Sequence, residues 1–111
     1  MSNSSPVAPP RWQQRFENYK KALSQLEKFL QKDVLNELEE QGLIQSFEYT
    51  YEVAWKVLQD VLRERGFVDI AGPRPSIEQA FQIGLIQDGL VWMQMLKDRN
   101  LTTHTYNETV V

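Results

Sequence analysis

The chain has 111 residues, a net charge of −3, one histidine and no cysteine. This length fits a single domain; the composition excludes a disulfide framework, a thiolate metal site and a histidine-rich zinc site, and the scattered basic residues argue against tight, sequence-independent binding of nucleic acid. Because no apolar run is long enough to cross a membrane and the N-terminus does not resemble a secretory signal, we expect a soluble cytoplasmic protein.

Residues 1–10 contain little that could be buried, and we expect a disordered tail there. The remaining residues, 11–111, are expected to form one helical domain. Its first helix is predicted from about Arg11 to Gln31, because apolar residues recur every three or four positions and so lie on one stripe. The stripe, which we expect to face the core, consists of Trp12, Phe16, Tyr19, Leu23, Leu26 and Leu30.

A short helical turn is predicted within residues 33–41, and Gly42 is expected to end it. A second long helix is predicted from about Leu43 to Arg65, and the glycine that follows, Gly66, should stop it. Its buried stripe is expected to contain Ile44, Phe47, Tyr51, Ala54, Trp55, Leu58, Val61 and Leu62.

The same helix also carries Glu48, Tyr49, Glu52 and Lys56. We favour a solvated face over a functional role for these residues, because charged residues on exposed helix faces commonly pair locally. Glu52 and Lys56 are one turn apart and are expected to form such an ion pair.

Residues 67–75 are predicted to connect the second helix to a short third helix. Three apolar residues of this connector are expected to pack on the domain: Phe67, Val68 and Ile70. Ser76 and Gln79 have the spacing of a capping box, which predicts that the third helix begins there, and Gly84 should end it. The residues of the third helix expected to face inward are Ile77, Ala80 and Phe81.

A fourth helix is predicted from about Gly89 to Asp98, with Asp88 as its N-cap. Three of its residues are expected in the core rather than on a partner surface: Trp92, Met95 and Leu96. Thr102 or Thr103 could then cap another helix that begins near His104. Neither an internal repeat nor the alternation typical of strands is present, which predicts an all-α fold.

Residues 99–106 hold the only histidine, His104, with Arg99 five positions before it and Tyr106 two positions after it. A guanidinium binds phosphate oxygens through a fork of donors, and an imidazole transfers protons near neutral pH. The pair therefore suits chemistry on a phosphodiester, with histidine as base or acid and arginine on the developing charge. Two further polar residues could add hydrogen bonds: Asn100 and Thr103.

Taken alone, this spacing is a weak signal, and a surface or capping histidine is the commoner case. The carboxylates of the chain have no obvious metal-ligand spacing. We therefore expect neither a metal nor a cofactor, and the case for a site depends on the rest of the chain.

Four blocks of the sequence, in this order, resemble the nucleotidyltransferase substrate-binding protein family, which belongs to the wider group of helical HEPN domains and includes the HepT-like toxins of HEPN/MNT toxin–antitoxin pairs. The blocks are Phe47–Lys56, Ala71–Pro75, Glu78–Ile86 and Asp98–Asn107, and the resemblance extends from about Trp12 to Asn107. It implies an antiparallel up-and-down helical bundle, usually a homodimer, whose partner is a small nucleotidyltransferase encoded next to it as the antitoxin.

The resemblance implies two alternative roles. In the first, which we favour, the helical chain is the substrate-binding subunit of a two-chain nucleotidyltransferase. In the second, it is a metal-independent endoribonuclease toxin: Arg99, His104 and Tyr106 match the family's motif of arginine, four residues, histidine, one residue and tyrosine, and Asn100 matches the polar residue after the arginine. RNA would be its substrate, because the 2′-hydroxyl can attack the adjacent phosphate. Adenylylation of Tyr106 by the partner would block the site with bulk and negative charge.

Members of the family usually continue past the motif with a long final helix, whereas this chain ends at Val111. We therefore expect a truncated C-terminal helix and exposed apolar surface on the other helices. At about 25 cal/mol per Å², a few hundred square ångströms of such surface would cost several kcal/mol. A tendency to self-associate is the expected consequence.

Overall fold

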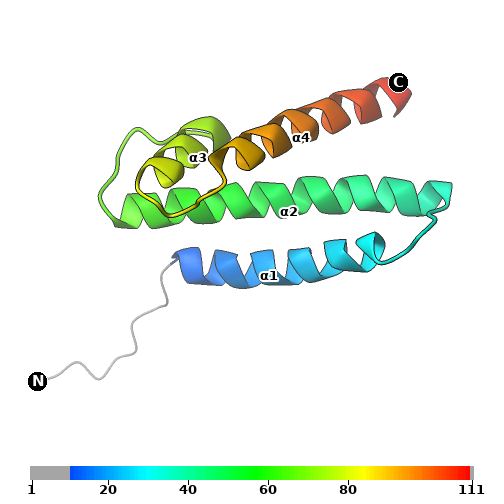
Figure 1. The fold of residues 1–111 in the computed structure, drawn as a ribbon, viewed down its shortest axis with the longest axis horizontal. Coiled ribbons are helices and arrows are strands. Elements are labelled where there is room, and N and C mark those ends of the chain that lie inside the picture. Colours follow the sequence, from blue (N-terminus) through cyan, green and yellow to red (C-terminus); the bar gives the residue numbers. More distant parts are fainter. Residues whose placement is uncertain (1–10, 111) are drawn as a thin grey trace, which may run out of the picture.

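The computed structural model describes residues 11–110, and it describes the side chains of residues 11–102. These residues form four helices, α1 (Arg11–Leu30), α2 (Glu37–Glu64), α3 (Pro73–Gln82) and α4 (Gly89–Val110). The predicted tail, residues 1–10, lies outside the described part of the chain. Figure 1 shows α1 running antiparallel to α2 along one side, while α3 and α4 pack on another side and α4 also runs antiparallel to α2. The expected all-α, antiparallel up-and-down arrangement is confirmed.

Of the other helices, only α2 packs along α1, and this leaves the apolar stripe of α1 half covered. Ala22 is the buried residue of α1, whereas Leu30 is 65% exposed and Phe16 is also exposed. The prediction that the whole stripe faces a core is therefore only partly right. One neighbouring helix covers a single strip of another helix, so the flanks of the stripe remain open to solvent.

The long helix α2 begins well before the predicted start and passes through Gly42 without a break. Asn36 caps it: Asn36 Oδ1 accepts a hydrogen bond from the Glu39 backbone N–H (2.8 Å), and Glu39 Oε1 accepts one from the Asn36 N–H (3.0 Å). The expected short turn in residues 33–41 is therefore wrong. Gly42 serves the packing of α1 instead, because a Cβ atom there would lie 2.9 Å from Phe29 Cζ.

The core lies where α2, α3, α4 and the connector between α2 and α3 meet. Its buried apolar cluster consists of Tyr51, Trp55, Leu58, Leu62, Ile70, Ile77, Ala80 and Leu96. Trp92 and Met95 pack against this cluster, as predicted for the inner side of α4. Gly66 follows the end of α2 with a φ of 95°, a left-handed conformation that glycine adopts without strain, and this stop was also predicted.

The connector between α2 and α3 is fixed by Ile70. The Ile70 side chain is buried, and its carbonyl oxygen accepts hydrogen bonds from Gln59 Nε2 (2.8 Å) and Arg63 Nη2 (3.2 Å). Phe67 packs against the core cluster. Val68, which was expected to pack as well, is exposed.

The short helix α3 begins at Pro73, in advance of the predicted start, because proline is well suited to a first helical turn where no N–H donor is needed. The predicted capping box at Ser76 is wrong: this serine is buried, and its Oγ donates to the Gly72 carbonyl oxygen (2.7 Å). Phe81, expected in the core, is 51% exposed. Its ring lies across the start of α4, where a Cβ atom at Gly89 would be 2.7 Å from Phe81 Cγ.

The last helix, α4, runs without interruption from Gly89 to Val110 and so contains the whole of residues 99–106. The predicted end at Asp98 and the predicted new helix near His104 are both wrong. Thr102 does not cap a helix; its Oγ1 donates to the Arg99 carbonyl oxygen one turn earlier (2.9 Å). Side chains at the start of this stretch contact α2, and such tertiary packing outweighs the local preference of threonine for helix caps.

Candidate functional site

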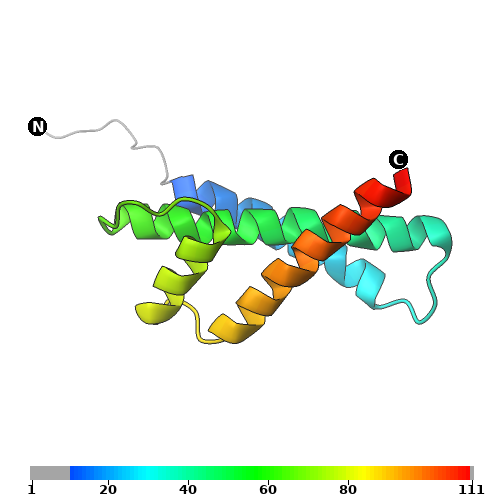
Figure 2. The same ribbon diagram turned by 90° about the horizontal axis from the view of Figure 1, so that it is seen from above.

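Arg99 lies where α4 crosses α2. Figure 2 shows α4 passing obliquely over α2, and the contacts at this crossing join the two helices. Arg99 Nη2 donates to Glu52 Oε2, and Arg99 Nη1 donates to Asn100 Oδ1 (3.1 Å). The Arg99 side chain is 23% exposed. A partly buried guanidinium with a fixed carboxylate partner can present its remaining donors in one direction.

Glu52 has a cation on each of its carboxylate oxygens. Lys56 Nζ lies 3.7 Å from Glu52 Oε1, while Arg99 occupies Oε2. The predicted Glu52–Lys56 pair is confirmed, but the solvated face expected around it is not, because Glu52 also bridges to α4. The sequence contains one indication that this side of α2 contacts another helix, namely that Glu48 and Glu52 are one turn apart. It does not indicate which helix would face them.

One turn further along the crossing, Glu48 approaches α4 as well. Thr102 Oγ1 lies 3.5 Å from Glu48 Oε2, at the long limit of a hydrogen bond. Glu48 and Glu52 are therefore on the side of α2 that faces the motif. On α4, Arg99 contacts Glu52 and Thr102, one turn later, approaches Glu48, one turn earlier on α2, as expected for two antiparallel helices.

Tyr51 anchors the earlier part of α4. Its hydroxyl donates to the Trp92 carbonyl oxygen (2.8 Å), and the rings of the two residues are 6.0 Å apart. Burial raises the pKa of Tyr51 to about 12; the negative charge of Glu52 acts in the same direction, and the positive charge of Arg99 opposes it. The tyrosine therefore stays protonated while it supports the helix that carries the motif.

Raising the pH is expected to weaken the fold through Tyr51. In the unfolded chain this hydroxyl loses its proton near its ordinary pKa of 10.0, whereas the folded chain holds the proton until about pH 12. The stabilisation is therefore complete below pH 10 and is lost as the pH rises to about 12, by roughly 2 kcal/mol. Urea unfolding between pH 9 and 12 measures this. Tyr51→Phe should show a smaller decline, and an identical decline in both proteins would contradict the assignment.

Of the predicted site residues, the structure describes the side chains of Arg99 and Asn100. The side chains of Thr103, His104 and Tyr106 lie outside the described residues, although their backbone belongs to α4. In a regular helix, positions five apart are separated by about 7.5 Å along the axis and about 140° around it. The close approach of Arg99 and His104 side chains therefore stays a prediction.

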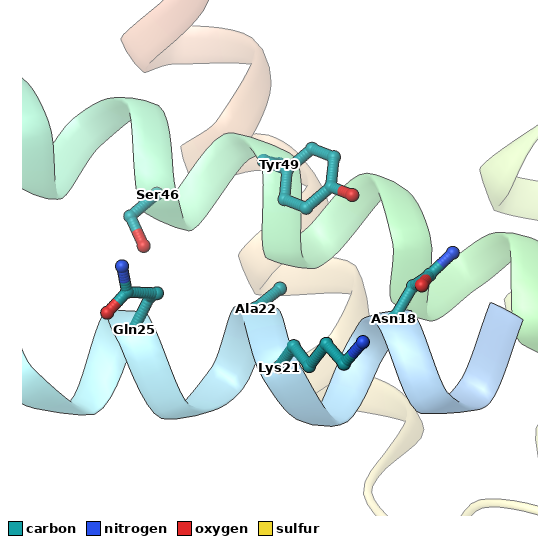
Figure 3. A pocket seen from close by; sticks show the side chains of 6 residues that line it. All are labelled: Asn18, Lys21, Ala22, Gln25, Ser46 and Tyr49. Atoms are coloured by element: carbon teal, nitrogen blue, oxygen red, sulfur yellow. The ribbon is translucent and has the colours of Figure 1, made fainter.

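A separate pocket lies between α1 and α2, on a different side of α2 from the crossing with α4. Its volume is about 220 Å³, and Figure 3 shows the side chains that line it: Asn18, Lys21, Ala22, Gln25, Ser46 and Tyr49. Neither Arg99 nor any other predicted site residue lines it. The candidate site is consequently an open helix face at the crossing rather than this pocket.

Metal-binding and membrane-spanning features are absent from the described part of the chain. Within it, no group of three or more histidine, cysteine, aspartate or glutamate residues could hold a metal ion. None of the helices described is both long enough and apolar enough to span a membrane.

Comparison with known proteins shows the family to which this chain belongs. Residues 14–111 match the family described as "Nucleotidyltransferase substrate binding protein like". The chain belongs to this family. It is also 31% identical over 71 residues to a protein of Haemophilus influenzae named "Probable ribonuclease HepT", an alignment that covers 60% of this chain and 49% of the relative.

A solved structure has a similar fold. The crystal structure of a protein from Thermus thermophilus superposes with a TM-score of 0.72 at 39% identity, covering 82% of this chain and 78% of that one. The chain thus has the helical fold of a solved protein, and it spans about half the length of the curated relative that it matches. The four sequence blocks identified above lie within the matched residues, so the resemblance they predicted is confirmed.

Proposed function

We propose that this chain is the partner subunit of a small nucleotidyltransferase, within a toxin–antitoxin pair in the cytoplasm, and that α4 from Arg99 onward is the face it offers to the nucleotide. The observation that carries the proposal is the guanidinium of Arg99, held at the α2–α4 crossing by Glu52 in a chain whose family is described by nucleotidyltransferase substrate binding. Membership of this family supports the choice of partner.

The chemistry of Arg99 suits this role. An arginine has five N–H donors in a fixed fork, and Glu52 and Asn100 each accept from one of its terminal nitrogens. The donors that remain can bind phosphate oxygens, and charge-assisted hydrogen bonds of this kind are about twice as strong as neutral ones.

Co-expression with the proposed partner, a small nucleotidyltransferase, tests the proposal. We expect a complex that survives affinity purification and size-exclusion chromatography, with light scattering giving the copy number of each chain. The same measurement reports whether the helical chain is a dimer, as we propose from the exposed apolar residues of α4: Leu90, Val91 and Leu101. Separate elution of the two proteins would count against the proposed partnership.

A second function is favoured by the relative named as a probable ribonuclease, which is 31% identical over 71 residues. In this role the chain cleaves RNA. His104 takes the proton of a 2′-hydroxyl or gives one to the leaving oxygen, and Arg99 stabilises charge on the phosphate. The partner then switches the activity off by transferring AMP to Tyr106, which puts negative charge where the RNA phosphate binds.

A further inference from the structure

We infer that Glu52 is a positioning residue for Arg99: its carboxylate fixes the direction in which the guanidinium meets a nucleotide phosphate. This inference rests on the proposed function of α4, and it adds a residue from α2 that does not belong to the arginine–histidine motif. The structure provides three reasons, which concern the contact, the crossing and the balance of charge.

The contact is specific to one oxygen of the carboxylate. Glu52 Oε2 accepts from Arg99 Nη2, and Lys56 Nζ lies 3.7 Å from the other oxygen. The lysine therefore occupies one side of the carboxylate and leaves the second oxygen to the arginine. Both members of the Glu52–Arg99 pair are partly buried, so solvent screens their attraction less than it would screen a pair on the open surface.

Because the contact lies at the crossing of α2 and α4, it constrains how α4 is rotated relative to α2. Among the described residues, polar contacts from α2 to α4 fall at three levels: Tyr51 with the Trp92 carbonyl, Glu52 with Arg99, and Glu48 with Thr102. The last of these, at 3.5 Å, is the weakest. The ion pair at Arg99 therefore constrains the rotation of α4 about its own axis near residues 99–102. Because a helix is stiff, that rotation also sets where positions 103–106 point.

The charges at the crossing cancel one another. Glu48, Glu52, Lys56 and Arg99 contribute two negative and two positive charges. Glu52→Gln removes one negative charge and leaves the group with a net positive charge, which attracts a polyanion more strongly. If Glu52 only opposed the phosphate electrostatically, its loss would strengthen binding through an unchanged Arg99. If Glu52 positions the arginine, its loss makes binding independent of Arg99.

A double-mutant cycle on the full chain separates these cases. The probe is a fluorescein-labelled single-stranded oligoribonucleotide, and its affinity is measured by anisotropy at fixed salt. In the wild-type background, Arg99→Ala is expected to weaken binding about tenfold, the effect of losing a charge-assisted contact. In the Glu52→Gln background, the same Arg99→Ala change is expected to weaken binding less than about twofold, a coupling of about fivefold.

Control variants distinguish positioning from folding. Lys56→Gln removes the other cation of Glu52 and should keep the full tenfold dependence on Arg99. Glu52→Asp keeps the charge and should restore part of that dependence; it also replaces Glu52→Gln if the latter does not fold, as judged by circular dichroism and thermal unfolding. A loss of equal size from Arg99→Ala in the wild-type and Glu52→Gln backgrounds would overturn the positioning role and leave the proposed function intact. No loss from Arg99→Ala in the wild-type chain would overturn both the positioning role and the proposed binding of phosphate by Arg99.

Discussion

Arg15→Ala is expected to lower the free energy of unfolding by about 3 kcal/mol, the effect of removing one member of a buried ion pair. Arg15 Nη1 lies 3.0 Å from Asp60 Oδ2, and the aspartate side chain is only 6% exposed. The Asp60 oxygen is in ionic contact without a well-aligned hydrogen bond, so the attraction of Arg15 is its main compensation. Without this arginine, a carboxylate on α2 stays buried and unpaired, and α1 loses its ionic link to α2.

Urea unfolding at neutral pH measures this effect. Lys28→Ala, which removes an exposed cation from the last turn of α1, is the control and should change stability by less than about 0.5 kcal/mol. Combining Arg15→Met with Asp60→Leu should recover most of the loss, because the uncompensated charge is then absent. A loss below about 1 kcal/mol for Arg15→Ala would mean that water or a neighbouring arginine already compensates Asp60.

The second large effect concerns RNA cleavage under the ribonuclease role. His104→Ala is expected to reduce the cleavage rate at least about 100-fold, as removal of a general acid or base does. Arg99→Ala is expected to reduce it by a similar factor, because charge then develops on the phosphate without a cation. Gel analysis of a defined RNA, incubated with purified chain in the presence of EDTA, measures both rates.

The matched control is Arg74→Ala on α3, an exposed arginine outside the motif, and it should cleave RNA at the wild-type rate. All variants must be purified in the same way, so that a contaminating nuclease would give equal rates in every preparation. Cleavage by His104→Ala at the wild-type rate would remove His104 from the site and, with it, the ribonuclease role as proposed.

The features of the fold that could be predicted are those that depend on local pattern. The apolar stripe of α2 and the stop at Gly66 followed from spacing and from the conformational freedom of glycine. The helix stop predicted at Gly42 is wrong because this glycine is required by packing between two helices. Phe29 of α1 occupies the space that a Cβ atom at Gly42 would fill. The capping box predicted at Ser76 is also wrong, because the Ser76 side chain is buried and its hydroxyl donates to the Gly72 carbonyl oxygen.

The residues of the candidate site also fall into two groups, those that a local pattern reveals and those that depend on a partner far away in the sequence. Arg99 and Asn100 could be identified from the motif and the family resemblance, which concern neighbouring residues in one stretch of chain. Glu52 could not, because its partner is 47 positions away and an acidic residue one turn from a lysine is fully accounted for by a local pair. The sequence offered Thr102 or Thr103 as a helix cap, whereas the Thr102 hydroxyl bonds within α4 and approaches α2.

The most direct test of the central claim, that Arg99 on α4 lies on the face by which this chain serves a nucleotidyltransferase, is a calorimetric titration of this chain with the proposed partner, a small nucleotidyltransferase, in the presence of ATP. We expect saturable binding with a Kd of about 1 μM or tighter, weakened about tenfold by Arg99→Gln and unchanged by the matched Arg74→Gln. Absence of binding at about 100 μM partner, or equal affinities for the two variants, would contradict the claim.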